Sequence, residues 1–255
     1  MSMQLLSDEN LQTLFKQIPE NEKPQKLYFK GKPELLERRK IAIVGARRAN
    51  KYTKTQTYML AHKLAEVGFA VVSGAAEGVD AFAHDGAYPS TIAVMPCGLD
   101  SYYPQSNKNL IQKIYDNSLA VSEYDEGEMP RNYTFVHRNR LVVGMSEAVV
   151  ITEADLKSGS MRSAEYALKY NIPLFVLAQR IDESLGTNTL LKEGRAKPIF
   201  DIDSFVRSLG VAIKPKEETR GTFGFSEFFA KHGDKVYEME LEGKIEIKNG
   251  SVKFL

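Results

Sequence analysis

The stretch Ala148-Val-Val-Ile-Thr152 decides the fold, because it is a continuous apolar run of the length that a buried parallel strand requires. A helical pattern over 135–145 precedes this run, and a second helical pattern over 161–170 follows it. The sequence therefore predicts a central strand between two helices in the middle of the chain.

Five other short apolar runs have the same character, and they alternate with helical patterns. This alternation predicts right-handed crossovers and an α/β fold with a doubly wound, mostly parallel sheet. The five runs are Lys40–Gly45, Phe69–Gly74, Thr91–Met95, Leu119–Ser122 and Pro173–Leu177.

Composition limits the class of protein. With 255 residues, 43% of them hydrophobic, the chain can bury the core of one α/β domain and a small appendage. It has no apolar run of about 18 residues, and its N-terminus lacks the pattern of a secretory signal, so we expect no membrane span. A single cysteine, Cys97, fits a reducing compartment, and we expect a cytoplasmic protein. Four scattered histidines supply no metal-ligand spacing, so we expect no metal.

The turn after the first confident strand argues against a nucleotide cofactor. Gly45-Ala-Arg-Arg-Ala-Asn50 lacks the G-x-G-x-x-G spacing that binds a pyrophosphate, and the chain has no P-loop motif. The next strand ends in Ser73-Gly74, without a carboxylate for a ribose hydroxyl. We therefore expect no cofactor.

The net charge is only +1, but the basic residues are clustered. From Arg38 through Ala65 there are eight Lys or Arg residues and no Asp or Glu, and 130–146 carries three arginines without a carboxylate. In a nearly neutral chain, such segments predict a local site for a polyanion, with a solvated basic surface as the alternative.

Ligands of a doubly wound sheet bind at the carboxyl ends of its strands, and the candidate residues gather there. Arg47 and Arg48 follow the first strand, where a guanidinium group can bind a phosphate through two hydrogen bonds. The alternative is a structural arginine that caps a neighbouring helix. Ser73, Gly74 and Gly98 follow the next two strands and complete this edge.

The turn Ser158-Gly159-Ser160 leads from the central strand into the next helix, with Ser160 as its predicted N-cap. Free amide groups and the helix dipole favour an anion at such a position. Lys157 stands beside the turn, and Arg138 and Arg140 precede the strand. We expect a phosphate to bind here.

Aromatic and basic residues alternate before the central strand: Phe135, with Tyr133 and His137, interleaves with Arg131 and Arg138. Single-stranded nucleic acid binds to such surfaces, because its bases stack on rings while cations contact the phosphates. The alternative is that Phe135 only anchors the start of its helix in the core.

A carboxylate and an imidazole, Asp80 and His84, share one face of a short helix. This spacing occurs in catalytic or metal-binding pairs, but a structural hydrogen bond is the commoner reason. Cys97 follows an apolar strand, and we expect a buried small side chain there.

The last forty residues change character. Glu217–Gly221 has the composition of a linker, and 223–242 has a broken helical pattern. Two alternating runs about Asn249-Gly250 then predict a β-hairpin. We therefore expect an N-terminal extension over 1–37 that packs on the core, a main domain over 38–212 and a small winged-helix-like module over 218–255.

An ordered set of motifs between Leu27 and Phe200 resembles the DprA/Smf family of DNA-processing proteins. The motifs are Gly45-Ala-Arg-Arg48, Ser73-Gly74, Gly78-Val-Asp80, Ala83-His84, Cys97-Gly98-Leu-Asp100, Tyr103-Pro104, Asn107, Ser122-Glu123, Phe135, Arg138-Asn-Arg140, Ser158-Gly-Ser160 and Gly186-Thr-Asn188.

The resemblance implies an extended Rossmann-like domain and a non-catalytic protein that binds single-stranded DNA during natural transformation. It implies a homodimer that protects incoming DNA and loads a RecA-type recombinase onto it, with single-strand binding protein as a further candidate partner. Arg47 would be a principal DNA-binding residue and Phe135 a base-stacking residue. Asn132 stands where relatives can carry lysine, and Arg131 is the candidate substitute.

A second family with this fold, the LOG-like nucleotide 5′-monophosphate phosphoribohydrolases, is the alternative. Its P-G-G-x-G-T-x-x-E motif ends in a glutamate that acts at the ribosyl centre. The corresponding run here, Lys157-Ser-Gly-Ser-Met-Arg-Ser163, has Ser163 at the position of that carboxylate. This difference argues against hydrolysis.

Overall fold

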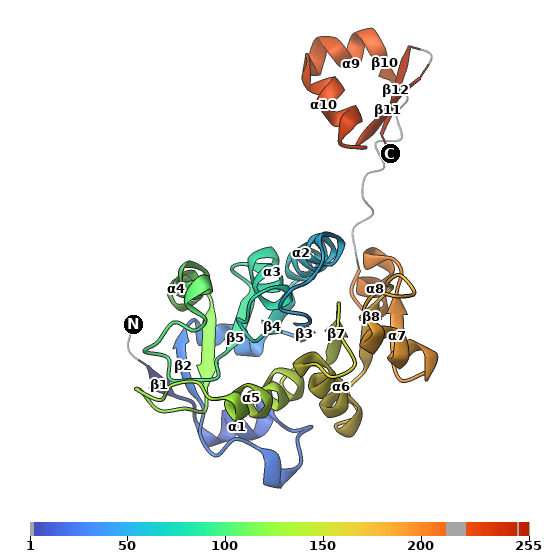
Figure 1. The fold of residues 1–255 in the computed structure, drawn as a ribbon. Coiled ribbons are helices and arrows are strands. Elements are labelled where there is room, and N and C mark those ends of the chain that lie inside the picture. Colours follow the sequence, from blue (N-terminus) through green and yellow to red (C-terminus); the bar gives the residue numbers. More distant parts are fainter. Residues whose placement is uncertain (1–2, 213–222, 249, 255) are drawn as a thin grey trace. The chain divides into compact units, whose positions relative to one another are not determined.

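The computed structural model describes residues 3–212, 223–248 and 250–254. The chain divides into two compact units, Met1–Ala212 and Ile213–Leu255, each described by itself below (Figure 1). The predicted linker over 217–221 and Asn249 of the predicted turn lie outside the described residues.

The larger unit contains a nine-stranded sheet in the order β1-β2-β6-β5-β4-β3-β7-β8-β9. Strands β3 to β9 pair in parallel, whereas β2 pairs antiparallel with β6, and β1 antiparallel with β2. The doubly wound, mostly parallel α/β fold is thus confirmed. The strands are β1 (Gln4–Leu5), β2 (Tyr28–Gly31), β3 (Lys40–Val44), β4 (Ala70–Ser73), β5 (Thr91–Val94), β6 (Leu119–Ser122), β7 (Ala148–Ile151), β8 (Leu174–Leu177) and β9 (Lys197–Ile199).

Helices cover both faces of this sheet, with α4, α3 and α2 along one face and α1, α5 and α6 along the other (Figure 1). None of the described helices is long and apolar enough to cross a membrane. The helices are α1 (Asp8–Leu14), α2 (Lys51–Glu66), α3 (Val79–Ala87), α4 (Lys108–Asn117), α5 (Asn132–Gly144), α6 (Gly159–Lys169), α7 (Leu185–Lys192) and α8 (Ile202–Ser208), with short 3₁₀ turns at η1 (Glu20–Glu22), η2 (Pro33–Glu37) and η3 (Gln105–Asn107).

The core explains the continuous apolar runs. Successive residues of a strand point to opposite faces, and here both faces are covered by helices. In β5, Ile92 and Val94 belong to the core cluster that contains residues of α1, α5 and α6, while Ala93 packs in the cluster that contains residues of α4. A strand that is buried on both sides therefore needs apolar residues at every position.

The strand order changes direction between β3 and β7. From β3 the chain builds β4, β5 and β6 on one side, and then returns to place β7, β8 and β9 on the other. Because β3 and β7 are parallel neighbours, their carboxyl ends lie next to each other at one edge of the sheet. This is the switch point at which doubly wound sheets bind their ligands.

The N-terminal residues contribute two strands that the sequence analysis did not recognise as part of the sheet. β2 continues the sheet beyond β6, with Tyr28 opposite Ser122 and Gly31 opposite Leu119. Gly31 adopts a φ of +107°, and a Cβ there would lie 2.2 Å from the carbonyl oxygen of Ser118. A glycine is therefore required where this strand ends.

Within its described residues, 223–248 and 250–254, the C-terminal unit holds a three-stranded sheet in the order β10-β12-β11 and two helices. The predicted hairpin is confirmed by the antiparallel pairing of β11 with β12. Phe228, Val236, Ile245 and Val252 form its small core. The winged-helix-like assignment stays a prediction. The elements are β10 (Phe223–Gly224), α9 (Phe225–His232), α10 (Lys235–Leu241), β11 (Ile245–Lys248) and β12 (Ser251–Phe254).

A close contact between α2 and α3 offers a test of the packing. A Cβ atom at Gly86 of α3 would lie 2.4 Å from the carbonyl oxygen of Tyr58 in α2. Gly86→Ala must push the helices apart, so we expect it to lower the free energy of unfolding by about 1–3 kcal/mol in urea titrations. Asp85→Ala, at an exposed neighbouring position, is the control. Unchanged stability of Gly86→Ala would contradict this packing.

Candidate nucleic-acid interface

A crevice of about 290 Å³ lies at the switch point, between the loops that follow β3, β4 and β7 and the helix α5. We call it the switch-point crevice. Arg47 and Phe135 belong to its lining, and so do Ser158, Gly159 and Ser160 at the start of α6. Residues far apart in the sequence thus meet at one edge of the sheet.

The floor of the crevice consists of its buried lining residues. Val44, Asp80, Arg138, Val142 and Ser163 are each at most 6% exposed, and all of them line the crevice. The crevice therefore extends inward from the solvent to the level of the sheet and the inner face of α5.

Arg138 supplies a buried cation to this floor. Its Nη1 donates to the carbonyl oxygen of Val94, and its Nε is buried without a hydrogen-bond partner. Burial lowers the pKa of Arg138, and the charge of Asp80 opposes that shift. A Cβ at Gly74 would lie 2.0 Å from Nη1, so the guanidinium group fits only because residue 74 is glycine.

Asp80 and His84 have different hydrogen-bond partners. The Asp80 carboxylate accepts from the backbone amides of Gly74 and Ala76, and burial raises its pKa against the opposing charge of Arg138. His84 accepts from the amide of Ala75 and contacts the Thr91 hydroxyl instead. The prediction of structural hydrogen bonding is confirmed, but the two side chains bond to the backbone and to Thr91 rather than to each other.

Arg47 and Phe135 form the exposed side of the crevice. The guanidinium carbon of Arg47 lies 5.3 Å from the centroid of the Phe135 ring, within the range of a cation–π interaction. Tyr103 approaches the same ring, with centroids 5.5 Å apart. These three residues also line an adjoining cavity of about 100 Å³. A cation and two aromatic rings thus stand beside the crevice, which suits a phosphate with an attached base.

The N-terminus of α6 forms the opposite wall. The predicted N-cap was wrong: Ser158 is the N-cap, and Ser160 lies within the first turn of the helix. The reason is that the turn closes earlier, with the amide of Met161 donating to the carbonyl oxygen of Ser158. The side chain of Ser158 makes no capping hydrogen bond, and its hydroxyl is buried without a partner. The helix dipole and the free amides still favour an anion here.

The family model for DNA recombination-mediator protein A matches residues 2–210. The chain belongs to this family. Over 176 residues it is 36% identical to DNA processing protein DprA of Streptococcus pneumoniae, covering 67% of this chain and 62% of that protein. Over 196 residues it is 35% identical to protein Smf of Synechocystis sp., covering 73% of this chain and 49% of that protein. The chain thus spans about half to two thirds of the length of these relatives.

Two solved structures of the family share the fold. One describes the single-stranded DNA binding mode of DNA processing protein A from Helicobacter pylori, at 46% identity and a TM-score of 0.78, covering 81% of this chain and 95% of that chain. The other is DprA from Streptococcus pneumoniae, at 30% identity and a TM-score of 0.75, covering 83% and 75%. The predicted DprA/Smf resemblance and Rossmann-like fold are confirmed.

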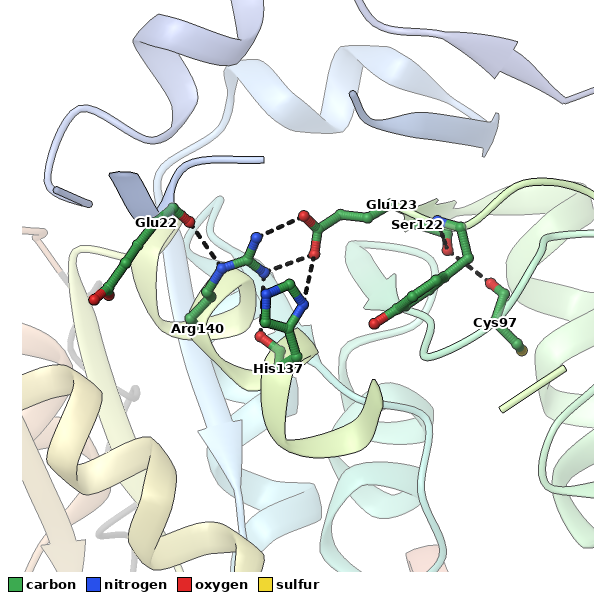
Figure 2. Close-up of polar contacts among 7 residues, drawn as sticks. Glu22, Cys97, Ser122, Glu123, His137 and Arg140 are labelled. Carbon is green, nitrogen blue, oxygen red and sulfur yellow. Dashed lines mark hydrogen bonds and ion pairs between the residues drawn. The ribbon is translucent and has the colours of Figure 1, made fainter. Parts of the chain in front are cut away.

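Within this family fold, Arg140 does not lie in the crevice as the sequence analysis expected. Its guanidinium group makes two hydrogen bonds of 2.6 Å to the Glu123 carboxylate and one of 2.8 Å to the carbonyl oxygen of Glu22 (Figure 2). The side chain is only 5% exposed. Arg140, on α5, therefore links the N-terminal residues to the residue that follows β6. Its charge is already paired with the carboxylate of Glu123.

His137 lies beside the same carboxylate, with Nδ1 at 3.7 Å from Oε2 of Glu123 (Figure 2). Partial burial and the charge of Arg140 lower its pKa, and Glu123 opposes them. The pairing of Arg140 and His137 with Glu123 could not be predicted from the segment 130–146, which has no carboxylate, because Glu123 lies outside that segment.

The other predicted site residues lie outside the crevice lining. Arg48, Arg131 and Lys157 are exposed, and each is the sequence neighbour of a lining residue or of the helix α5. Ser73 is buried and donates to the carbonyl oxygen of Ile43, and a Cβ at Gly98 would lie 2.4 Å from the carbonyl oxygen of Asp125. Ser73 therefore bonds to the neighbouring strand at the end of β4, and Gly98 allows the loops after β5 and β6 to approach closely.

Three residues that were not predicted to bind phosphate also line the crevice: Asp80, Asn139 and Ser163. Ser163 had an available signal, because it follows Ser160 by three residues and so lies on the same face of α6. Asp80 and Asn139 belong to the motifs Gly78-Val-Asp80 and Arg138-Asn-Arg140, but nothing in the sequence assigned either residue to phosphate binding.

Proposed function

We propose that this family member binds single-stranded DNA in the switch-point crevice. The observation that carries the proposal is that Arg47, Phe135 and the N-terminus of α6 line one crevice. The amides of α6 and the Arg47 guanidinium would bind the sugar-phosphate backbone, while a base stacks beside Phe135. The Helicobacter pylori relative, described for its single-stranded DNA binding mode, supports the proposal by its similarity over 81% of this chain.

We further propose that the crevice binds DNA without catalysing a reaction. Among the lining residues that the structure describes, Asp80 is the only carboxylate, and it already accepts two backbone amides and faces Arg138. A phosphoribohydrolase requires a carboxylate that is available to the ribosyl centre, and Ser163 provides none. Incubation with nucleoside monophosphates tests this point, because release of free base would favour the hydrolase.

The same proposal includes a homodimer that protects incoming DNA and loads a RecA-type recombinase, as expected for members of the DprA/Smf family. Sedimentation of the protein alone tests the dimer. Strand exchange by a recombinase, on DNA coated with single-strand binding protein, tests the loading. A monomer that fails to stimulate exchange would remove both parts while leaving DNA binding intact.

Arg47→Ala is expected to weaken binding of oligo-dT about tenfold, because a charge-assisted contact to phosphate is lost. The side chain is exposed, so the melting temperature should change by only a few degrees. Fluorescence titrations at several salt concentrations measure both the affinity and its salt dependence, whose slope should become shallower by about one.

Arg207→Ala, which removes an exposed cation of α8 outside the crevice, is the matched control. Equal affinities of the Arg47→Ala and Arg207→Ala proteins would argue against the crevice as the DNA site. Affinity of the wild type that does not depend on salt would argue against binding through the phosphates.

A further inference from the structure

The floor of the switch-point crevice and its wall at the start of α6 contain residues whose buried polar atoms have no hydrogen-bond partner among the described residues. The hydroxyl oxygens of Ser158 and Ser163 and the Nε of Arg138 are buried and have no hydrogen bond within the described residues. All three residues line the crevice. Buried polar groups are nearly always paired, and a group left unpaired costs free energy. Two hydroxyl groups and a guanidinium N–H without partners, on residues that line one crevice, point to a ligand that accepts several hydrogen bonds.

The chemistry of these groups selects a phosphate-type anion. Hydroxyls and a guanidinium N–H donate, and the first turn of α6 presents backbone amides beside them, at the end of an 11-residue helix. Asp80 lines the floor as well, but its carboxylate accepts from the amides of Gly74 and Ala76, and Arg138 offsets its charge. The floor thus retains free donors for an anion.

The shape of the floor limits which phosphate can enter. Val44, Val142 and Ser163 belong to the floor, and their exposed fractions of 6%, 0% and 1% place them at its buried level. An internal phosphodiester carries a sugar on both sides, and both sugars would have to fit in a crevice of about 290 Å³. A terminal phosphate monoester carries one sugar, which can remain near Arg47 and Phe135 while the phosphate reaches the floor.

We propose that the switch-point crevice binds the terminal phosphate monoester of a DNA strand, with the hydroxyl group of Ser163 as the donor that distinguishes it from an internal phosphodiester. A monoester offers a third unesterified oxygen and about −1.5 to −2 charges. The third oxygen contacts Ser163, while the others face Ser158, Arg138 and the amides of α6. This inference rests on the proposed function and adds that strand ends are preferred.

Three forms of the same oligo-dT test the preference: one with a 5′-phosphate, one with a 3′-phosphate and one with neither. Fluorescence titration of the full chain at fixed ionic strength gives the affinity of each. One of the phosphorylated forms is expected to bind about tenfold more tightly than the unphosphorylated form, and it identifies the end that is recognised. Extra charge alone also raises affinity, so the comparison must include variants of the floor.

Ser163→Ala removes the proposed donor and is compatible with the helix, because alanine has a high helix propensity. In this variant, we expect the ratio of the two affinities to fall from about tenfold to about threefold or less. Ser204→Ala, at an exposed position of α8 outside the crevice, is the matched control and should retain the full ratio.

Each other outcome is decisive. Equal affinities for all three oligonucleotides would overturn the preference for ends and leave the proposed function in place. A full ratio in Ser163→Ala would overturn the assignment of the floor. Failure of the wild type to bind any of the oligonucleotides would overturn the proposed function and this inference together.

Discussion

Replacement of Arg138 by methionine is expected to lower the free energy of unfolding by about 3 kcal/mol or more. Arg138 is only 4% exposed, and its charge opposes the rise that burial causes in the pKa of Asp80. Methionine fills a similar volume but leaves the Asp80 charge buried without a neighbouring cation. It also removes the hydrogen bond to the carbonyl oxygen of Val94. Urea denaturation at neutral pH measures the loss.

The double variant with Asp80→Asn separates the charge from the packing. If the two charges stabilise each other, the loss in the double variant should be smaller than the sum of the single losses by more than about 1 kcal/mol. Arg131→Met, at an exposed position next to the same helix, is the control and should change stability by less than about 0.5 kcal/mol. A stable Arg138→Met protein would show that the arginine serves only the ligand.

The sequence predicts the interior of this fold well, because a strand that is buried on both faces has apolar residues at consecutive positions. Val149 and Val150 point to opposite faces of β7, and both are fully buried. Edge strands leave a weaker pattern. β9 contains Lys197 and Pro198, both exposed, and β1 has only two residues, so neither resembles a buried strand in the sequence.

The position of the site follows from topology, whereas the roles of its arginines do not. Strand ends converge at the switch point, so Arg47 and Ser158 were expected near each other. Whether an arginine is free or paired depends on partners that are distant in the sequence. Arg138 bonds to a carbonyl 44 residues away, and Arg140 pairs with a carboxylate 17 residues away. Local composition therefore identified three arginines as equivalent, although the structure gives each a different environment.

The buried His84 predicts how acid destabilises this protein. Its Nε2 accepts a hydrogen bond from the amide of Ala75, so that nitrogen carries no proton. Its Nδ1 lies 2.6 Å from the hydroxyl oxygen of Thr91, which itself donates to the carbonyl oxygen of Val71. Nδ1 must therefore be the donor, and the ring is neutral. Burial, together with the charge of Arg138, lowers the pKa of His84 to about 3.

The sign of the effect follows from the two pKa values. The folded value is about 3, below the ordinary value of 6.5 that applies to the unfolded chain, so between them only the unfolded chain binds this proton. The stability is fully present above pH 6.5 and falls by up to about 1.4 kcal/mol per pH unit as the pH decreases toward 3. At pH 5 this histidine alone should account for a loss of about 2 kcal/mol.

Urea denaturation of the wild type and of His84→Gln, from pH 8 to pH 4.5, measures how protonation of His84 changes the free energy of unfolding. The variant is expected to be less stable at pH 8, because the geometry of two buried hydrogen bonds changes. Its stability should then fall less steeply below pH 6.5, by about the slope of one proton. Asp80 and His137 titrate in both proteins, so the difference between the two curves isolates His84. Parallel curves would mean that the His84 ring becomes protonated in the folded protein as readily as in the unfolded chain. The assignment of a buried, neutral imidazole would then be wrong.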